Sequence, residues 1–193
     1  MKTDKTKPAG GLTANQNEDL DKNLHEMFLE ELADILDAEK QLTSALPSMA
    51  EAASSEELRA ALESHLDETK QHVIRLEQVF KSVNAPVKSK TCKAMKGLVE
   101  EAEDMMEEYE GSPALDAGLI AAVQKMEHYE IAAYGTVCAW AEQMEHTDAV
   151  DLLERSLAEE KEADESLTEI ALSVANQDGE DFEDEEHPAG SNR

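Results

Sequence analysis

An acidic residue, Glu39, occupies the middle of an apolar stripe that constrains how this part of the chain can fold. The stripe advances in alternating steps of four and three residues, which places its members on one face of an α-helix. Its members are Phe28, Leu32, Ile35, Glu39, Leu42, Leu46 and Met49. Because a carboxylate removed from water is very costly without a partner, the stripe predicts a helix that buries Glu39 against neutralising groups.

Three later segments repeat this pattern, each with an acidic residue near the middle of a helical apolar face. The central acids are Glu68, Glu127 and Glu160. In an antiparallel bundle of helices of similar length, the midpoints lie at one level. The sequence therefore predicts that Glu39 and these three side chains meet in one buried layer.

Capping and breaking signals divide the chain into four long helices and one short helix. We predict helices over about residues 24–53, 54–83, 92–109, 113–144 and 147–175. Pro47 should kink the first helix or split off its last turn, and Ser54 with Glu57 forms a capping-box pattern before the second. The connections between successive long helices are short, long and short, and the short helix lies within the long one. They predict an all-α fold, a ferritin-like antiparallel four-helix bundle with a short extra helix in the long crossover.

The predicted bundle spans residues 23–176 and lies between two polar segments. Residues 1–22 have the composition of a flexible N-terminal tail, and residues 177–193 that of an acidic disordered tail. No apolar run approaches the roughly 20 residues needed to span a bilayer, and the N-terminus lacks the apolar core of a signal peptide. We therefore expect a cytoplasmic protein in which Cys92 and Cys138 are buried free thiols.

The chain is strongly acidic, with a net charge of −28 from 45 acidic and 17 basic residues. Such a surface repels nucleic acids and anionic membranes, so neither is an expected partner. Two explanations of this excess of acidic residues are open. One is a solvated surface suited to a salt-rich, halophilic cytoplasm, and the other is attraction of cations toward a site.

Two pairs of residues in the acidic layer have the spacing of metal ligands. His72 follows Glu68 by four residues, and Asp164 follows Glu160 by four, so each pair can hold one ion. The repeat predicts a pseudo-two-fold site for two metal ions. Carboxylates with one or two imidazoles suit iron or manganese, and to a lesser degree zinc.

Six carboxylates, with Glu130 counted among them, exceed the charge that two divalent ions cancel. We therefore expect Glu130 or Asp164 to be protonated, to lie outside the ligand set or to bind a mobile ion. The main alternative is a buried salt-bridge network. It needs cations, but the lysines fall off the helical faces and Arg75 alone lies beside one. A single glutamate could also lie on the rim, and a single histidine could be a hydrogen-bonded core residue.

Five stretches of the chain resemble the YciE/YciF-like family of ferritin-like proteins over about residues 24–176. They are DILDAEKQL, HLDETKQHVIRLEQVF, CKAMKGLVEEAEDM, DAGLIAAVQKMEHYEIAAYGTVCAWA and LLERSLAEEKEADESLTEIA. The resemblance implies a di-metal carboxylate centre, frequent dimerisation, and a role in stress responses and iron handling. It also implies that Glu39, Glu68, Glu127 and Glu160 correspond to the one-per-helix glutamates of di-iron proteins.

The chain departs from the Glu-x-x-His motif that the wider superfamily carries on its second and fourth helices. Gln71 follows Glu68 by three residues, and Ala163 follows Glu160 by three. The ligand set on these helices is therefore open. His65, one turn before Glu68, is a further candidate ligand or hydrogen-bond donor. Glu101 is a weaker candidate, because its stretch in the crossover also resembles the family.

These residues predict a di-iron protein, with a ferroxidase-like oxidoreductase as the candidate activity, in which two Fe(II) ions are oxidised by O2 or peroxide. Glu39 and Glu127 would be terminal ligands, Glu68 and Glu160 bridging ligands, and His72 a nitrogen ligand. Tyr134 could donate a hydrogen bond or an electron, or only pack in the core. The alternatives are a manganese protein that consumes peroxide and a non-enzymatic acidic stress protein that binds metal. A homodimer is expected rather than a storage cage.

Overall fold

The computed structural model describes the backbone of residues 14–181 and the side chains of residues 22–173. It contains five helices and no strand within these residues. They are α1 (Ala14–Ala52), α2 (Glu56–Ser82), α3 (Lys93–Glu108), α4 (Leu115–Gln143) and α5 (Thr147–Asp181). The predicted all-α fold is confirmed. Of the two predicted tails, residues 1–13 and 182–193 lie outside the described part of the chain.

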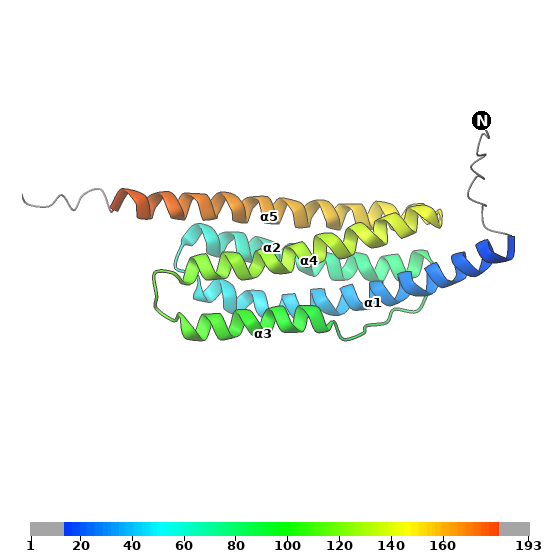
Figure 1. Ribbon diagram of the computed structural model, residues 1–193, viewed down its shortest axis with the longest axis horizontal. Helices are drawn as coiled ribbons and strands as arrows, with labels where there is room; N and C mark the ends of the chain where they lie inside the picture. Colours follow the sequence, from blue (N-terminus) through cyan, green and yellow to red (C-terminus); the bar gives the residue numbers. More distant parts are fainter. Residues whose placement is uncertain (1–13, 182–193) are drawn as a thin grey trace, which may run out of the picture.

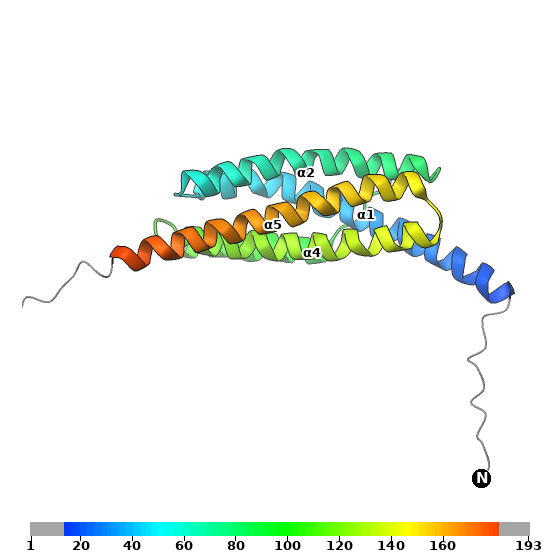
Figure 2. The same ribbon diagram turned by 90° about the horizontal axis from the view of Figure 1, so that it is seen from above.

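Four long helices form the bundle, and the short helix α3 lies along one side of it (Figure 1). Around the bundle, α1 packs against α2, α2 against α5, α5 against α4, and α4 against α1. Helix α3 packs on α1 and α4. The view from above shows α5 crossing obliquely between α2 and α4 (Figure 2). The long crossover between α2 and α4 thus carries the predicted short helix.

The apolar core is divided into two parts by a polar layer. Along α1, for example, Phe28 to Leu36 belong to one part, and Leu42 to Ala53 belong to the other. Helices α2, α4 and α5 each contribute residues to both parts. Because each apolar face is interrupted at its midpoint and the helices are of similar length, the interruptions coincide.

Several helix ends differ from the prediction. Helix α1 begins at Ala14, because residues 14–22 contain no Pro or Gly that would stop its N-terminal extension. It also continues unbroken through Pro47, since Leu46 and Met49 on either side are fully buried in the core. The last turn is therefore not split off. Helix α5, the last helix in the described part of the chain, extends to Asp181 rather than ending near residue 175.

The N-cap of α2 is Ser55 rather than Ser54, since the Ser55 hydroxyl accepts a hydrogen bond from the Leu58 amide. The cause of this shift is Asp116, at the start of α4. Its two carboxylate oxygens accept hydrogen bonds from the amides of Ser54 and Ser55, each at 2.8 Å. This contact fixes where α2 begins relative to α4.

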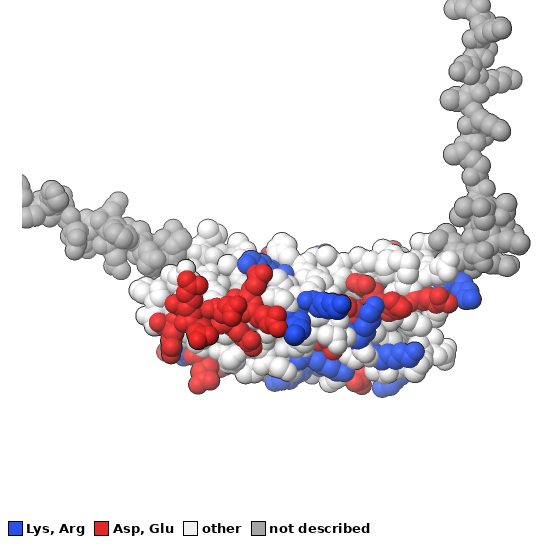
Figure 3. All heavy atoms as spheres, turned by 60° about the horizontal axis from the view of Figure 1, so that its bottom comes forward, with Lys and Arg blue, Asp and Glu red and all other residues white. Residues whose placement is uncertain are grey.

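The surface charge is uneven. Figure 3 shows Asp and Glu gathered at one end of the face that carries α3, and Lys and Arg interspersed with acids over the rest. The exposed acids of the second half of α3 are Glu100, Glu101, Glu103, Asp104, Glu107 and Glu108. Among the described helices, none combines the length and the apolar character that crossing a membrane requires. Cys92 and Cys138 are buried free thiols, as predicted.

Candidate metal centre

Six ionisable side chains from the four long helices meet in the polar layer at the centre of the bundle. Helix α1 contributes one, α2 two, α4 two and α5 one. They are Glu39, His65, His72, Glu127, Glu130 and Glu160. Each is at most 4% exposed. The layer therefore holds four carboxylates and two imidazoles away from solvent.

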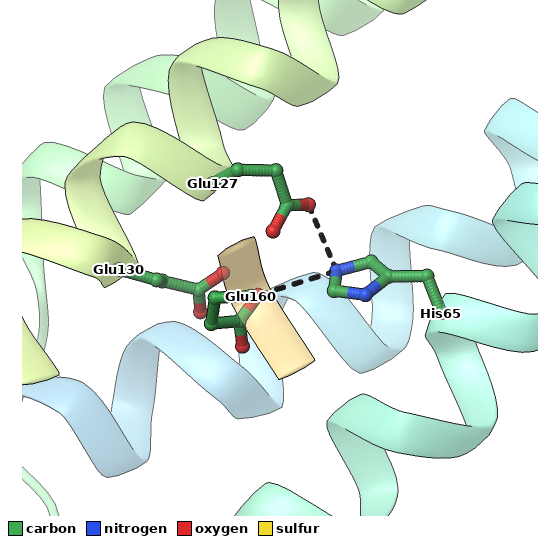
Figure 4. A group of neighbouring side chains, drawn as sticks. All are labelled: His65, Glu127, Glu130 and Glu160. Carbon is green, nitrogen blue, oxygen red and sulfur yellow. Dashed lines mark ion pairs between the residues drawn. The ribbon is translucent and has the colours of Figure 1, made fainter. Parts of the chain in front are cut away.

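One group of ligand atoms surrounds His65 (Figure 4). Its Nε2 lies 2.9 Å from Glu127 Oε1 and 3.9 Å from Glu160 Oε2. Glu130 extends from α4 toward the same point. One ligand atom from each of these four residues lies within 4.8 Å of the others. This spacing can surround a single ion.

A second group surrounds His72. Its Nδ1 lies 2.6 Å from Glu160 Oε1 and 3.2 Å from Glu39 Oε1. These three residues also offer ligand atoms within 4.8 Å of one another. Glu160 belongs to both groups, with one oxygen facing each histidine. The arrangement is therefore two adjoining ligand groups that share one carboxylate.

The carboxylates of this layer lack the donors that a buried anion needs. No donor among the described residues has hydrogen-bond geometry toward either oxygen of Glu127, Glu130 and Glu160 or toward Glu39 Oε2, and the close approaches of His65 to Glu127 and of His72 to Glu160 are ion-pair contacts. Burial raises the pKa of Glu130 well above its usual range, and the charges of Glu39 and Glu160 add to this. Burial likewise raises the pKa of Glu160 to about 7, although His72 opposes the shift. An unpaired buried carboxylate is costly, so without metal these groups hold protons, and a bound cation would take the place of those protons.

Protein cations do not supply this charge. Arg75 is the only buried Lys or Arg among the described residues, and it is bound to Glu159 instead. The lysines nearest in sequence, at positions 40, 70, 125 and 161, are exposed. The histidines compensate in part, because contacts with Glu160 and Glu39 raise the pKa of His72 to about 10 despite its burial. Two imidazolium groups cannot balance four ionised carboxylates, so the described residues hold no complete salt-bridge network for the fully ionised layer, and protons on Glu130 and Glu160 supply the remainder when no metal is bound.

Three predicted site residues are not brought into the buried layer. Glu68 is 41% exposed and lies beside His65, with 3.7 Å between its Oε2 and His65 Nδ1. Asp164 contacts Gln124 and His128 at the surface. Glu101 is 72% exposed and pairs with Lys125 at 3.7 Å. His65, by contrast, is fully integrated into the layer.

The sequence analysis missed Glu159, which holds the outer face of His72. The His72 Nε2 lies 2.9 Å from Glu159 Oε2. Arg75 in turn donates hydrogen bonds to Glu159 and to Ser156, the latter at 2.8 Å. The signal was present in the sequence as an acid beside Glu160, but the neighbouring position on a helix points about 100° away. This carboxylate fixes Nδ1 of His72 toward Glu39 and Glu160.

Tyr134 takes the hydrogen-bonding role that the sequence left open. Its hydroxyl, on α4, donates a hydrogen bond to Glu39 Oε1, and its side chain is fully buried. The other oxygen of Glu39 has no partner among the described residues. Tyr134 therefore orients the Glu39 carboxylate and leaves Oε2 free to bind a cation.

Replacement of Glu159 by Gln should weaken metal binding without changing the number of ions bound. The amide removes the charge that orients the His72 ring, and partners of this kind typically account for a roughly 10–100-fold difference in metal affinity. Titration with Co(II) would measure the change. Glu154→Gln, an exposed substitution on the same helix, is the matched control. Equal affinities in the two variants would contradict the role assigned to Glu159.

The metal-free protein should lose stability as the pH rises from about 5 to about 10. Between pH 4.5 and about 7 the folded state holds a proton on Glu160 that the unfolded chain releases, so the free energy of unfolding falls. His72 acts in the same direction from pH 6.5 to about 10. The Glu160 contribution alone is about 3 kcal/mol. Urea unfolding in the presence of a chelator would measure this slope.

The control for this pH series is Glu160→Gln, which removes one of the titrating groups and should reduce the slope. Bound metal should have the opposite effect, because the ligands must lose protons to bind it. A metal-free protein whose stability is constant over this pH range would show that these groups are not protonated in the folded state.

The fold and the cluster together define the class of protein: an all-α, ferritin-like bundle with a buried carboxylate–histidine cluster that could bind metal. The chain belongs to the family described as Domain of unknown function (DUF892), whose model matches residues 23–180. It is similar to Protein YciF of Escherichia coli (strain K12), with 44% identity over 160 residues that cover 82% of this chain and 96% of YciF. The predicted resemblance is confirmed.

Solved structures give the same result. The crystal structure of the E. coli stress protein YciF matches with a TM-score of 0.77 and 45% identity, over 79% of this chain and 97% of that one. YcfI from Rhodopseudomonas palustris matches with a TM-score of 0.73 and 43% identity, over 75% and 92%. A protein from Xanthomonas campestris pv. campestris, at 20% identity and a TM-score of 0.61, shares the fold over 81% of this chain and 99% of that one.

Proposed function

We propose that the protein binds two iron ions at the centre of the bundle and takes part in their oxidation by O2 or peroxide. The observation that carries this proposal is the pair of buried ligand groups that share Glu160. Four carboxylates carry four negative charges, which two divalent cations cancel. The oxygen atoms without hydrogen-bond partners supply free ligand positions for those ions.

The ligand set follows from the two groups. Glu39 and His72 would hold one ion, and His65, Glu127 and Glu130 the other, with Glu160 between them. Mixed carboxylate and imidazole ligands suit iron and manganese. Bound Fe(II) would supply the electrons that reduce O2 or peroxide. Tyr134 and Glu159 would keep Glu39 and His72 oriented as the charge at the centre changes.

Addition of Fe(II) to metal-free protein under air tests this proposal. We expect two ions bound per chain and consumption of O2 that stops when both are oxidised. Glu39→Ala should bind fewer ions and consume less O2. Failure of the wild-type protein to bind Fe(II) would overturn the proposal.

Two other results would change the chemistry but keep the site. Binding of Fe(II) without O2 or peroxide consumption would indicate a non-enzymatic metal-binding stress protein. Manganese in the native protein, with peroxide consumed faster by the Mn form than by the Fe form, would indicate a manganese enzyme. Because YciF is described as a stress protein, a role in stress protection is part of the proposal.

The proposal also includes a homodimer, which the family resemblance implies. Light scattering would test it, and a mass twice that of the chain is expected. A particle of 24 subunits would instead indicate an iron-storage cage. The predicted cytoplasmic location stays a prediction.

A further inference from the structure

A cavity of about 120 Å³ lies beside the metal centre, between α2, α4 and α5. It is several times larger than the space that one water molecule needs. Residues from α2 and α5 provide its polar lining: Ser64, His65, Glu68, Glu162 and Ser166. Leu62 and Val123 contribute apolar walls. The cavity thus combines acidic and hydroxyl side chains with apolar walls.

The cavity extends from the surface to His65, a member of the buried layer. Ser64, Glu162 and Ser166 are exposed, and Glu68 is 41% exposed, so these four residues form a rim that solvent reaches. His65 is 4% exposed and lines the same cavity. Its Nε2 lies 2.9 Å from Glu127 Oε1, inside the layer. One imidazole therefore separates the cavity from the carboxylates.

His65 has an unused polar atom on the side of the cavity. Its Nδ1 has no hydrogen-bond partner among the described residues and lies 3.7 Å from Glu68 Oε2. This distance is too long for a hydrogen bond, so the contact leaves both groups free for another ligand. A nine-tenths buried imidazole with a free nitrogen facing a cavity is unusual, because buried polar groups are ordinarily paired.

Ala163 explains why there is space for the cavity. It lies one turn after Glu160 on α5 and lines the cavity with a single methyl group. Any longer side chain at this position would project into the space beside His65. The small residue therefore keeps the cavity open beside His65.

We propose that this cavity is a capture site through which a divalent cation reaches the buried centre, with Glu68 and Glu162 as its first ligands. The inference rests on the proposed function, since it assumes that the centre is loaded with metal. Two rim carboxylates match the charge of one divalent ion, and hydroxyl and carboxylate oxygens suit a cation that keeps part of its water. A negative cleft with low-dielectric walls also raises the local cation concentration. His65 then lies between the capture site and the buried centre.

Stopped-flow loading of the metal-free protein with Co(II) tests the capture site, because the visible spectrum of Co(II) reports binding to nitrogen and oxygen ligands. The variant Glu68→Gln/Glu162→Gln should load about tenfold more slowly but reach the wild-type stoichiometry and final spectrum. Glu63→Gln/Glu165→Gln makes the same change in charge at exposed positions of α2 and α5 outside the cavity, and should load at the wild-type rate. Ala163→Leu, which fills the cavity without a change in charge, should also slow loading.

Four outcomes would overturn this inference. Wild-type loading rates in Glu68→Gln/Glu162→Gln would exclude capture by the rim, and a lower final stoichiometry in Glu68→Gln alone would make Glu68 a ligand of the resident ions. If a cavity variant preloaded with Fe(II) consumed O2 more slowly than the wild type but loaded Co(II) at the wild-type rate, the cavity would be a route for the oxidant. A wild-type protein that binds no Co(II) would overturn the proposed function itself, and so is distinct from the other three.

Discussion

Glu160→Ala should abolish binding of both metal ions, whereas Glu39→Ala and Glu127→Ala should each leave one. Glu160 is the only residue common to the two ligand groups, and its two oxygens face different histidines, 2.6 Å from His72 Nδ1 and 3.9 Å from His65 Nε2. Without it each group loses a ligand, and two divalent ions would face three carboxylates. Metal content per chain after dialysis against Fe(II) or Mn(II) would measure the loss.

The matched control for Glu160→Ala is Glu154→Ala, which removes an exposed carboxylate from the same helix and should leave two ions bound. Circular dichroism would verify that both variants stay helical. If Glu160→Ala retained two ions per chain, the two groups would not share a ligand, and the centre proposed here would be wrong.

The position of the site along the bundle was predictable from sequence. The apolar face of a helix indicates which of its residues are buried. An acidic residue within that face indicates where along the helix a polar layer interrupts the apolar core. Glu39, Glu127 and Glu160 each interrupt such a face near the middle of a long helix, and all three lie in the buried layer. Because helices of similar length pack with their midpoints at one level, their meeting followed from pattern alone.

The rotation of each helix about its axis was not predictable where the face itself is polar. On α2, His65 and His72 are seven residues apart and differ by only about 20° around the helix, whereas Glu68 lies about 60° to one side of His65. The helical periodicity is compatible with all three residues on one face of α2. Packing decides that the two histidines point inward and that Glu68 lies on the rim of the cavity.

The rotation of α5 about its axis was likewise not predictable from the sequence pattern. Asp164 lies about 40° around the helix from Glu160, and its side chain is one methylene shorter than that of glutamate. It meets Gln124 and His128 on the outside of α4 instead of the buried layer. Glu159, about 100° away in the other direction, reaches the outer nitrogen of His72 because Arg75 and His72 hold it there. For Glu159 the sequence shows only an acid beside Glu160, and neither contact can be assigned without the fold.

Glu130→Met should stabilise the metal-free protein by about 1–3 kcal/mol and destabilise the metal-loaded one relative to wild type. Glu130 is fully buried, and neither of its oxygens has a hydrogen-bond partner among the described residues. Methionine has a similar length and volume and carries no group that must be desolvated. In the absence of metal the substitution therefore removes a cost without leaving a cavity. Urea unfolding with a chelator would measure the gain.

With saturating metal the order should reverse. A ligand that binds only the folded state stabilises it according to its concentration relative to its dissociation constant, and Glu130→Met loses a carboxylate from the group around His65. Glu142→Met, an exposed substitution on the same helix, should change stability by less than about 0.5 kcal/mol in either condition. A loss of stability in metal-free Glu130→Met would show that Glu130 has a structural partner in the folded protein. If Glu130→Met remained more stable than the wild type in saturating metal, Glu130 would hold no ion. A ligand in this position must lower the stability of the folded protein when the centre is empty and raise it when the centre is filled.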